Sequence, residues 1–301
     1  MKKKGAFSTI AILIPYFGKW PEWIDYFMES CRYNPSIDWI FFTDCGTPNN
    51  IPKNIIIHEM SFVDYRKLLQ EKLGVNTEKM TPYKLCDFKP TYGFVHEDDI
   101  KDYDFFGFGD IDVIYGNIRA FLTGEVLKNN VISTHNNRIS GHFALFRNND
   151  KYRNAFMKIP NWKSLLENEK HFGVDEGAFS RIFRRRKKGS ILFFLVMKIF
   201  DSYHRKTYFV EQYSTILAPI PWIDGSYEHP TIWYWRKGHL TNNKDGEREF
   251  MYLHFMNFKS DKWLREELRP AKWSLIDSIV KEAFPENWDS FMITDTGFKK
   301  L

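Results

Sequence analysis

An alternating pair of aspartates between two apolar runs constrains this chain more than any other stretch of its sequence. Residues 105–108 form an aromatic run of strand length, Asp110 and Asp112 follow it, and residues 113–115 resume the apolar pattern. In an extended backbone, side chains two positions apart lie on the same side. We therefore expect both carboxylates just beyond the carboxyl end of a buried strand, where open α/β sheets bind their ligands.

Two carboxylates on one side suit a hard divalent cation, which takes its other ligands from phosphate oxygens and water. The pair therefore predicts a site for Mn²⁺ or Mg²⁺. A second alternating pair, Asp102 and Asp104, comes before the aromatic run. We expect that pair at the opposite end of the sheet, which makes it the weaker candidate for the metal.

The order of apolar runs predicts an α/β fold with a doubly wound, mostly parallel sheet flanked by helices. Strand-length runs at residues 9–14, 39–43 and 55–57 alternate with amphipathic stretches, as is typical of parallel sheets with helical crossovers. Ser61 fits the N-cap of one such helix, which should end at Gly74. Further strands are expected at residues 131–133, 141–146 and 232–236, with polar helices after residue 261.

Residues at the ends of the first strands are candidates for nucleotide binding. Tyr16 and Asp44 each follow a strand and suit a base pocket, although an ordinary turn explains either residue alone. Lys84, Asp87 and Lys89 crowd a short stretch upstream of the aspartate pair. The lysines suit phosphates and Asp87 suits sugar or ribose hydroxyls, and an exposed helix face is the alternative.

Three later stretches carry further candidates. The polar residues 135–138 lead back into an apolar strand and suit the floor of an acceptor site. Asp175 and Glu176 begin an amphipathic stretch, where helix capping is the ordinary interpretation and a carboxylate at the reacting carbon is the functional one. His254 lies late in an apolar run, where a histidine is most often simply packed, and Lys259 follows it.

Charge and cysteine content limit the cellular setting. Nine Lys or Arg and one Asp fall between residues 181 and 206, so the positive charge behind the net +5 is concentrated in this segment. A local excess of this kind argues against a nucleic-acid partner.

Within that segment, the run of apolar residues 191–197 is too short to span a bilayer, which needs ~20 residues. Peripheral contact with anionic lipid is one interpretation and a core helix is the other. Three cysteines without metal-type spacing predict a cytoplasmic protein, at the inner face of the membrane if the segment binds lipid.

The order of these parts resembles the GT-A superfamily of glycosyltransferases, and within it a little-characterised group of bacterial surface-polysaccharide transferases. The matching pieces are residues 14–18, 84–90, 109–112, 175–176 and 254–259. The resemblance implies one catalytic domain over residues 1–301, with a nucleotide-sugar half to about 116, an acceptor half to about 260 and a helical tail from 261. It also implies a nucleoside-diphosphate sugar donor, with UDP-sugars favoured, and a glycan or lipid-linked acceptor.

The same resemblance implies roles for the site residues. Asp110, Asp112 and His254 would bind Mn²⁺ or Mg²⁺, and Lys259 would hold the donor diphosphate. Metal-binding retaining members often carry His-x-x-Gly-x-x-Lys, whereas here Asn257 replaces the glycine and the lysine comes one residue early. Inversion, with Asp175 or Glu176 as base, and retention therefore both stay open.

Two other function classes stay open as well. A metal-dependent nucleotidyltransferase can use the same carboxylate pair, but such enzymes usually have a glycine-rich phosphate loop after the first strand, and residues 15–18 are not one. A non-catalytic carbohydrate or membrane-surface module would use the aromatic cluster at 233–235 and the basic block at 184–188. That module would need neither the metal nor Asp175.

Overall fold

The computed structural model describes residues 8–184, 203–280 and 289–301, and its centre is a seven-stranded sheet. The strand order is β3-β2-β1-β4-β7-β6-β8. Only β7 runs antiparallel to its neighbours among the strands of this sheet as described, so the predicted mostly parallel α/β sheet is confirmed. The strands are β1 (Ile10–Pro15), β2 (Ile37–Thr43), β3 (Ile55–Glu59), β4 (Phe105–Gly109), β6 (Val131–Ser133), β7 (Phe143–Arg147) and β8 (Thr207–Phe209).

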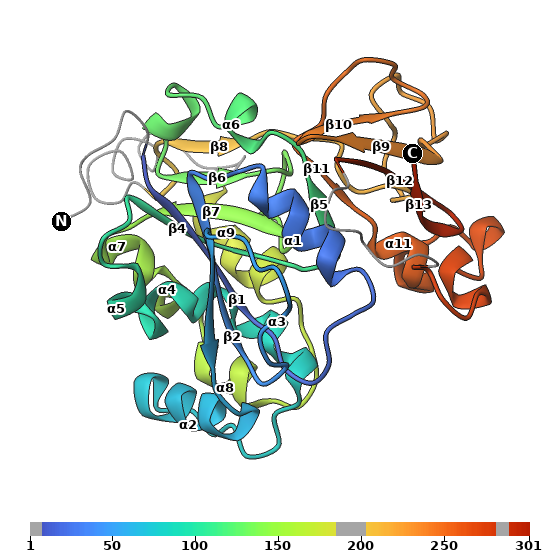
Figure 1. Ribbon diagram of the computed structural model, residues 1–301. Helices are drawn as coiled ribbons and strands as arrows, with labels where there is room; N and C mark the ends of the chain where they lie inside the picture. Colours follow the sequence, from blue (N-terminus) through green and yellow to red (C-terminus); the bar gives the residue numbers. More distant parts are fainter. Residues whose placement is uncertain (1–7, 185–202, 281–288) are drawn as a thin grey trace.

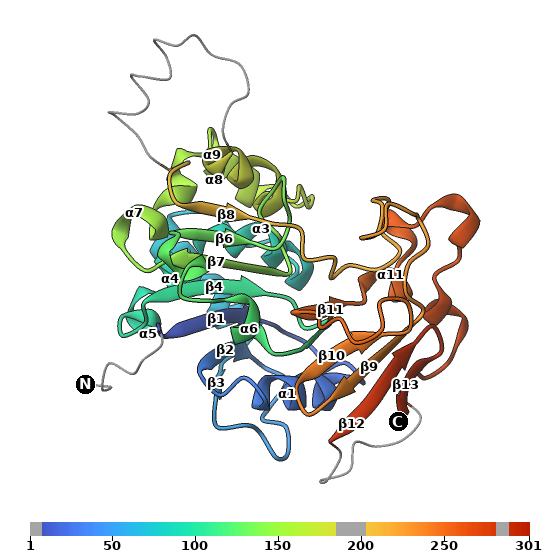
Figure 2. The ribbon, with the colours of Figure 1, turned by 90° about the horizontal axis from the view of Figure 1, so that it is seen from above.

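Helices cover both faces of this sheet (Figures 1 and 2). On one face, buried residues of α2 and α9 pack with Phe106 and Phe108, and on the other, α1 and α6 pack with Phe105. Strand β4 contributes to both cores because successive strand residues point to opposite faces. The helices are α1 (Ile24–Arg32), α2 (Phe62–Leu73), α3 (Leu85–Phe88), α4 (Tyr92–Val95), α5 (Glu97–Ile100), α6 (Ile118–Phe121), α7 (Asp150–Arg153), α8 (Trp162–Glu167) and α9 (Ser180–Phe183).

Local sequence signals fix the ends of these elements. The Ser61 side chain accepts a hydrogen bond from the backbone N–H of Asp64, and Gly74 ends α2 in the left-handed conformation with φ of 61°. Both ends of α2 are therefore as predicted. Gly107 lets β4 approach β7 closely, since a Cβ there would overlap the carbonyl oxygen of Ala144.

A smaller antiparallel sheet, ordered β10-β9-β12-β13, lies beside α1 (Figure 2). Its buried rings pack against α1; for example, Tyr26 meets Phe291 edge-on at 4.9 Å between ring centroids. The strands are β9 (Ile232–Arg236), β10 (His239–Asn242), β12 (Ser290–Thr294) and β13 (Gly297–Lys300).

The prediction of a helical tail from residue 261 is wrong for its last described part, residues 289–301. Its first part forms only the short 3₁₀ turns Asp261–Trp263, Glu266–Leu268 and Lys272–Leu275, and its last part forms β12 and β13. In β12, Phe291 and Ile293 are buried while Met292 between them is partly exposed. This two-residue period is the signature of a half-buried strand.

A two-stranded antiparallel pair connects the aspartate loop to the late apolar run. Strand β5 (Val113–Tyr115) pairs with β11 (Tyr252–His254), and His254 lies opposite Val113. The short helix α11 (Met256–Lys259) follows directly. The pairing therefore brings a distant histidine and lysine next to Asp112.

The basic and apolar segment proposed for lipid contact lies mostly outside the described residues, because 185–202 are not described. In the part of the chain that is described, no helix is both long and apolar enough to cross a membrane. All three cysteines are free, and Cys31 is fully buried.

Candidate metal centre

The Asp110 and Asp112 carboxylates converge where β4 ends and β5 begins. One ligand atom from each, together with a ring nitrogen of His254, lies within 4.8 Å of the others. Nε2 of His254 is 3.6 Å from Oδ1 of Asp112. The two aspartates thus point together, as their alternation predicted, at the carboxyl edge of the parallel strands.

His254 has one ring nitrogen that a cation would satisfy. Its Nδ1 lies 3.1 Å from the Thr215 hydroxyl, whereas its buried Nε2 has no hydrogen-bond partner. An unpartnered buried polar atom costs about 1–3 kcal/mol. A ring nitrogen that faces two carboxylates fits a divalent cation, so the residues present suit Mn²⁺ or Mg²⁺.

A lysine neutralises each carboxylate. Lys89 Nζ lies 2.5 Å from Asp110 Oδ1 and donates to the Gly141 carbonyl at 2.9 Å, and Lys259 Nζ lies 2.8 Å from Asp112 Oδ2. Burial opposes ionisation of Asp112, but Lys259 and His254 outweigh it and hold its pKa well below the usual range. Asp112 is therefore ionised at neutral pH, as a metal ligand has to be.

Asp175 and Glu176 open a π-helical turn, Asp175–Phe179, and Asp175 lies within reach of the charge of Lys89. A Cβ on Gly141 would lie 2.7 Å from Oδ2 of Asp175, so the glycine lets this carboxylate approach the backbone. Burial raises the pKa of Asp175 to about 6 against the opposing charge of Lys89. Asp175 therefore titrates close to neutral pH, in the range suited to a general base.

Glu176 behaves differently from its neighbour. Its Oε1 accepts from the Gly141 N–H at 3.1 Å and its Oε2 from Nε of Arg138 at 3.0 Å. Burial opposes ionisation, but Arg138 and His135 outweigh it and lower the pKa of Glu176. The two adjacent carboxyls are thus pushed in opposite directions, which is a pattern of sites with distinct acid and base roles.

Tyr16 and Asp44 lie at the same sheet edge. The Gly18 N–H donates to Oδ1 of Asp44 at 2.7 Å, and the Tyr16 ring stacks on Trp20 with 5.4 Å between centroids. Burial, then Cys45 and Asp112, raise the pKa of Tyr16. Tyr16 therefore lies close enough to Asp112 to be affected by its charge, and Asp44 binds the backbone of the turn that follows Tyr16.

The structure corrects the roles predicted for Lys84 and Asp87. Lys84 is 2% exposed and Asp87 is fully buried; they pair at 2.8 Å, and Lys84 Nζ also donates to the carbonyls of Leu165 and Lys170. Asp87 also accepts from the backbone N–H groups of Phe172 and Val174. With all its donors used inside the fold, this pair anchors a loop and is neither a phosphate contact nor an exposed helix face.

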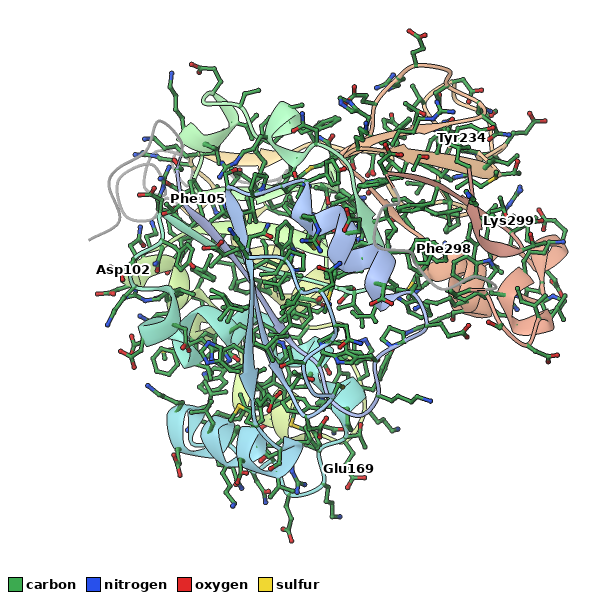
Figure 3. All side chains as sticks on the ribbon, viewed as in Figure 1. Asp102, Phe105, Glu169, Tyr234, Phe298 and Lys299 are labelled. Carbon is green, nitrogen blue, oxygen red and sulfur yellow. The ribbon has the colours of Figure 1, made fainter. Side chains whose placement is uncertain are left out.

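The rival pair Asp102 and Asp104 lies away from the centre, as expected. Asp104 Oδ2 accepts from the backbone N–H of Thr9, at the amino end of β1. Asp102 is exposed at the periphery of the molecule, whereas Phe105 lies inside it (Figure 3).

Trp23, which immediately precedes α1, is a site residue that was not predicted from the sequence. Its indole N–H donates to the Ile111 carbonyl at 2.8 Å, between the two aspartates. Lys259 Nζ lies 4.7 Å from the centre of the Trp23 ring. An isolated tryptophan at a helix start carries no signal of this role, which depends on contacts between segments far apart in the chain.

His142 was also missed as a site residue. Its ring stacks on that of His254, with 4.1 Å between centroids and 22° between planes. Burial and the neighbouring His254 and His135 hold the pKa of His142 well below its usual range. His142 also belongs to a second group of close ligand atoms, with His135 and Glu176.

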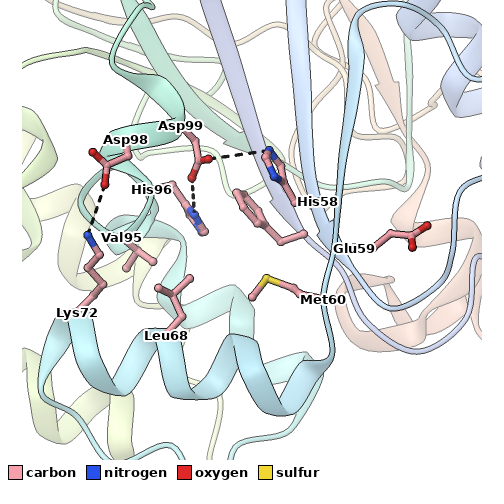
Figure 4. A pocket seen from close by; sticks show the side chains of 10 residues that line it. His58, Glu59, Met60, Leu68, Lys72, Val95, His96, Asp98 and Asp99 are labelled. Atoms are coloured by element: carbon pink, nitrogen blue, oxygen red, sulfur yellow. Dashed lines mark ion pairs between the residues drawn. The ribbon is translucent and has the colours of Figure 1, made fainter.

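A separate cavity of about 350 Å³ lies between β3, α2 and the segment around α5 (Figure 4). Asp99 faces both His58, at 3.9 Å, and His96, at 3.3 Å. His96 Nε2 is also paired, at 2.9 Å, with the Tyr65 hydroxyl. Both ring nitrogens of His96 are thus engaged, so this cavity is a weaker candidate than the aspartate centre.

Comparison with known proteins places the chain in a family without assigning an activity. Residues 12–283 match the model of a family described as "Family of unknown function (DUF6625)". A comparison with curated proteins found no match.

Proposed function

The chain belongs to this family of unknown function, and from its site we propose that it is a metal-dependent glycosyltransferase. It would transfer a sugar from a nucleoside-diphosphate sugar to a hydroxyl of a glycan or lipid-linked glycan. The observation that carries the proposal is the convergence of Asp110, Asp112 and the unpartnered Nε2 of His254.

The charges around this centre suit a departing diphosphate. Asp110, Asp112 and His254 would hold Mn²⁺ or Mg²⁺, which as a Lewis acid would stabilise charge on the leaving group. Lys259 and Lys89 each lie beside one of the aspartates, so both can add fixed positive charge where negative charge develops. The Trp23 ring lies 4.7 Å from the Lys259 ammonium and would help to position it through a cation–π contact.

The other residues fit the remaining parts of the reaction. The stacked Tyr16 and Trp20 rings offer an aromatic face to a nucleotide base, with Asp44 beside them for ribose hydroxyls. In an inverting reaction, Asp175 would take the proton of the acceptor hydroxyl. In a retaining reaction, it would position the sugar and stabilise its developing positive charge.

Thermal stabilisation and turnover test this proposal together. We expect UDP or GDP with Mn²⁺ to raise the melting temperature, and a UDP-sugar to be hydrolysed slowly without acceptor. Both effects should disappear in Asp110→Asn/Asp112→Asn. A matched control is Asp98→Asn/Asp102→Asn, which removes two exposed carboxylates elsewhere.

The same assays separate the alternatives. Pyrophosphate release from a nucleoside triphosphate would show a nucleotidyltransferase instead. No response to any nucleotide would show a non-catalytic module. Wild-type turnover in Asp110→Asn/Asp112→Asn would sink the site assignment itself.

A further inference from the structure

Three side chains beside the aspartate centre form a second cluster of metal-ligand atoms. His135 follows β6, His142 precedes β7, and Glu176 lies in the π-helical turn. One ligand atom from each lies within 4.8 Å of the others. This set of two imidazoles and one carboxylate is richer in nitrogen than the aspartate centre, so it favours a different class of cation.

His135 is oriented as metal-binding histidines are. Its Nδ1 faces the Glu211 carboxylate, with 3.1 and 3.3 Å to the two oxygens. A carboxylate accepts the Nδ1 proton and so leaves the lone pair on Nε2, which is the arrangement found behind metal-binding histidines. The Arg138 Nη2, which can only donate, lies 3.2 Å from Nε2, so both neighbours require the same tautomer.

His142 supplies the observation that ordinary packing does not explain. The residue is 3% exposed, and its Nε2 is buried without a hydrogen-bond partner. Its ring lies edge-to-face with His135 at 5.1 Å and stacks on His254 at 4.1 Å. The second cluster therefore contacts the aspartate centre through the stacked rings of His142 and His254, but its ligand atoms are different ones.

Arg138 satisfies only part of this cluster. Its guanidinium pairs with Glu176 and lies against His135, but it leaves Nε2 of His142 unpartnered. The Arg138 side chain is 36% exposed, so it can move into solvent without crossing the core. The cluster already attracts one cation, and a smaller divalent cation would engage all three ligands.

We propose that His135, His142 and Glu176 form a second divalent-cation site, selective for Zn²⁺-like ions, which binds when Arg138 moves aside. Three protein ligands with one open position are the usual set of a non-structural zinc site. Binding would tie the loop between β6 and β7 to the turn that carries Asp175. The site needs no nucleotide and does not depend on the proposed transfer reaction.

Zinc titration in an Asp110→Asn/Asp112→Asn background isolates this site from the first. ZnCl₂ is titrated by calorimetry, and bound metal is counted after gel filtration. We expect one Zn²⁺ per chain in this background and none when His135→Gln/His142→Gln is added. His239→Gln, which changes an exposed histidine on β10, should keep the zinc.

Two further single changes keep both histidines. Glu211→Gln should weaken zinc binding by about 10–100-fold, since it removes the carboxylate behind His135, whereas Arg138→Gln should tighten it. Zinc retained without the two histidines, or no zinc in the Asp110→Asn/Asp112→Asn protein, would overturn the proposal. If the double-histidine variant does not fold, the single changes still decide the question. The proposal would be overturned if Glu211→Gln and Arg138→Gln bound Zn²⁺ with the same affinity as the Asp110→Asn/Asp112→Asn protein.

Discussion

Two lysine–aspartate pairs from neighbouring stretches of the chain have opposite characters. In Lys84–Asp87, the lysine also donates to two backbone carbonyls and the aspartate also accepts from two backbone N–H groups, all inside the fold. In Lys89–Asp110, the aspartate is partly exposed and borders the unpartnered Nε2 of His254. We call the first pair closed, because all its partners are inside the fold, and such a network stabilises the fold. The second pair is open, because an unpartnered ring nitrogen beside it can still bind a ligand.

The largest expected effect is on stability, from breaking the closed pair. Asp87→Ala leaves the buried Lys84 ammonium unpaired, and removal of one partner of a buried pair costs roughly 3–5 kcal/mol. Urea denaturation at pH 7 measures this loss. Asp110→Ala also removes the partner of a buried lysine, Lys89, but the Asp110 carboxylate is itself 31% exposed, so water can take its place and the loss should be smaller. An equal loss in both variants would remove the contrast.

The next largest effect is on the turnover rate, when one carboxylate of the metal centre is removed. Asp110→Asn or Asp112→Asn should lower the rate with a UDP-sugar and Mn²⁺ by on the order of 10²-fold or more, because the charge stabilising the leaving group is weakened. The melting temperature should change little. A large fall in stability without any specific loss of rate would show that these aspartates are structural, like Asp87.

A third effect separates the adjacent carboxyls by pH. The pKa of Asp175 is about 6 in the fold against an ordinary value of 3.8, so ionisation of Asp175 reduces stability as the pH rises from about 4 to 6. Asp175→Asn cannot ionise. In EDTA, its stability relative to wild type should therefore rise across that window, by about 2–3 kcal/mol at pH 7.5.

Glu176→Gln is the control with the opposite sign. The pKa of Glu176 is lowered in the fold, so its ionised form stabilises the protein at neutral pH and that contribution is lost as the pH falls through the lowered pKa. Glu176→Gln should thus be less stable than wild type at pH 7.5 and approach it in acid. Parallel pH profiles for both variants would contradict the assigned environments.

The smallest effect concerns the position of Lys259. Trp23→Leu removes the ring beneath the ammonium, a contact worth about 0.5–2 kcal/mol, so we expect a several-fold rise in KM for the nucleotide sugar and a smaller fall in kcat. Trp23→Phe, which keeps a ring, should recover part of the loss. Equal kinetics for the two variants would show that the ring does not position the lysine.

The sequence predicted those parts of the site whose positions depend only on neighbouring residues in the chain. The two-residue spacing of Asp110 and Asp112 directly after β4 is enough to place them on the same side, and chain order is enough to place Tyr16 and Asp44 at the ends of β1 and β2. The resemblance supplied His254, but its position against Asp112 depends on the register of β5 with β11. No local pattern carries that register.

The errors have the same origin. Lys84 and Lys89 look equivalent in sequence, and both are buried in the fold. They differ in their partners: Lys84 pairs with the fully buried Asp87 and donates to the carbonyls of Leu165 and Lys170, whereas Lys89 pairs with the partly exposed Asp110. The tail after residue 261 looked helical because its alternating strand residues, such as Phe291 and Ile293, are few and need β9 as a partner. Tertiary contacts decided both cases.

Anomalous diffraction from crystals grown with Mn²⁺ and UDP is the most direct test of the metal centre. We predict a manganese peak bonded to Asp110, Asp112 and Nε2 of His254, with Lys259 moved from Asp112 to the diphosphate. Crystals that contain UDP but show no manganese peak among these three residues, with Lys89 still paired to Asp110 and Lys259 to Asp112, would contradict it.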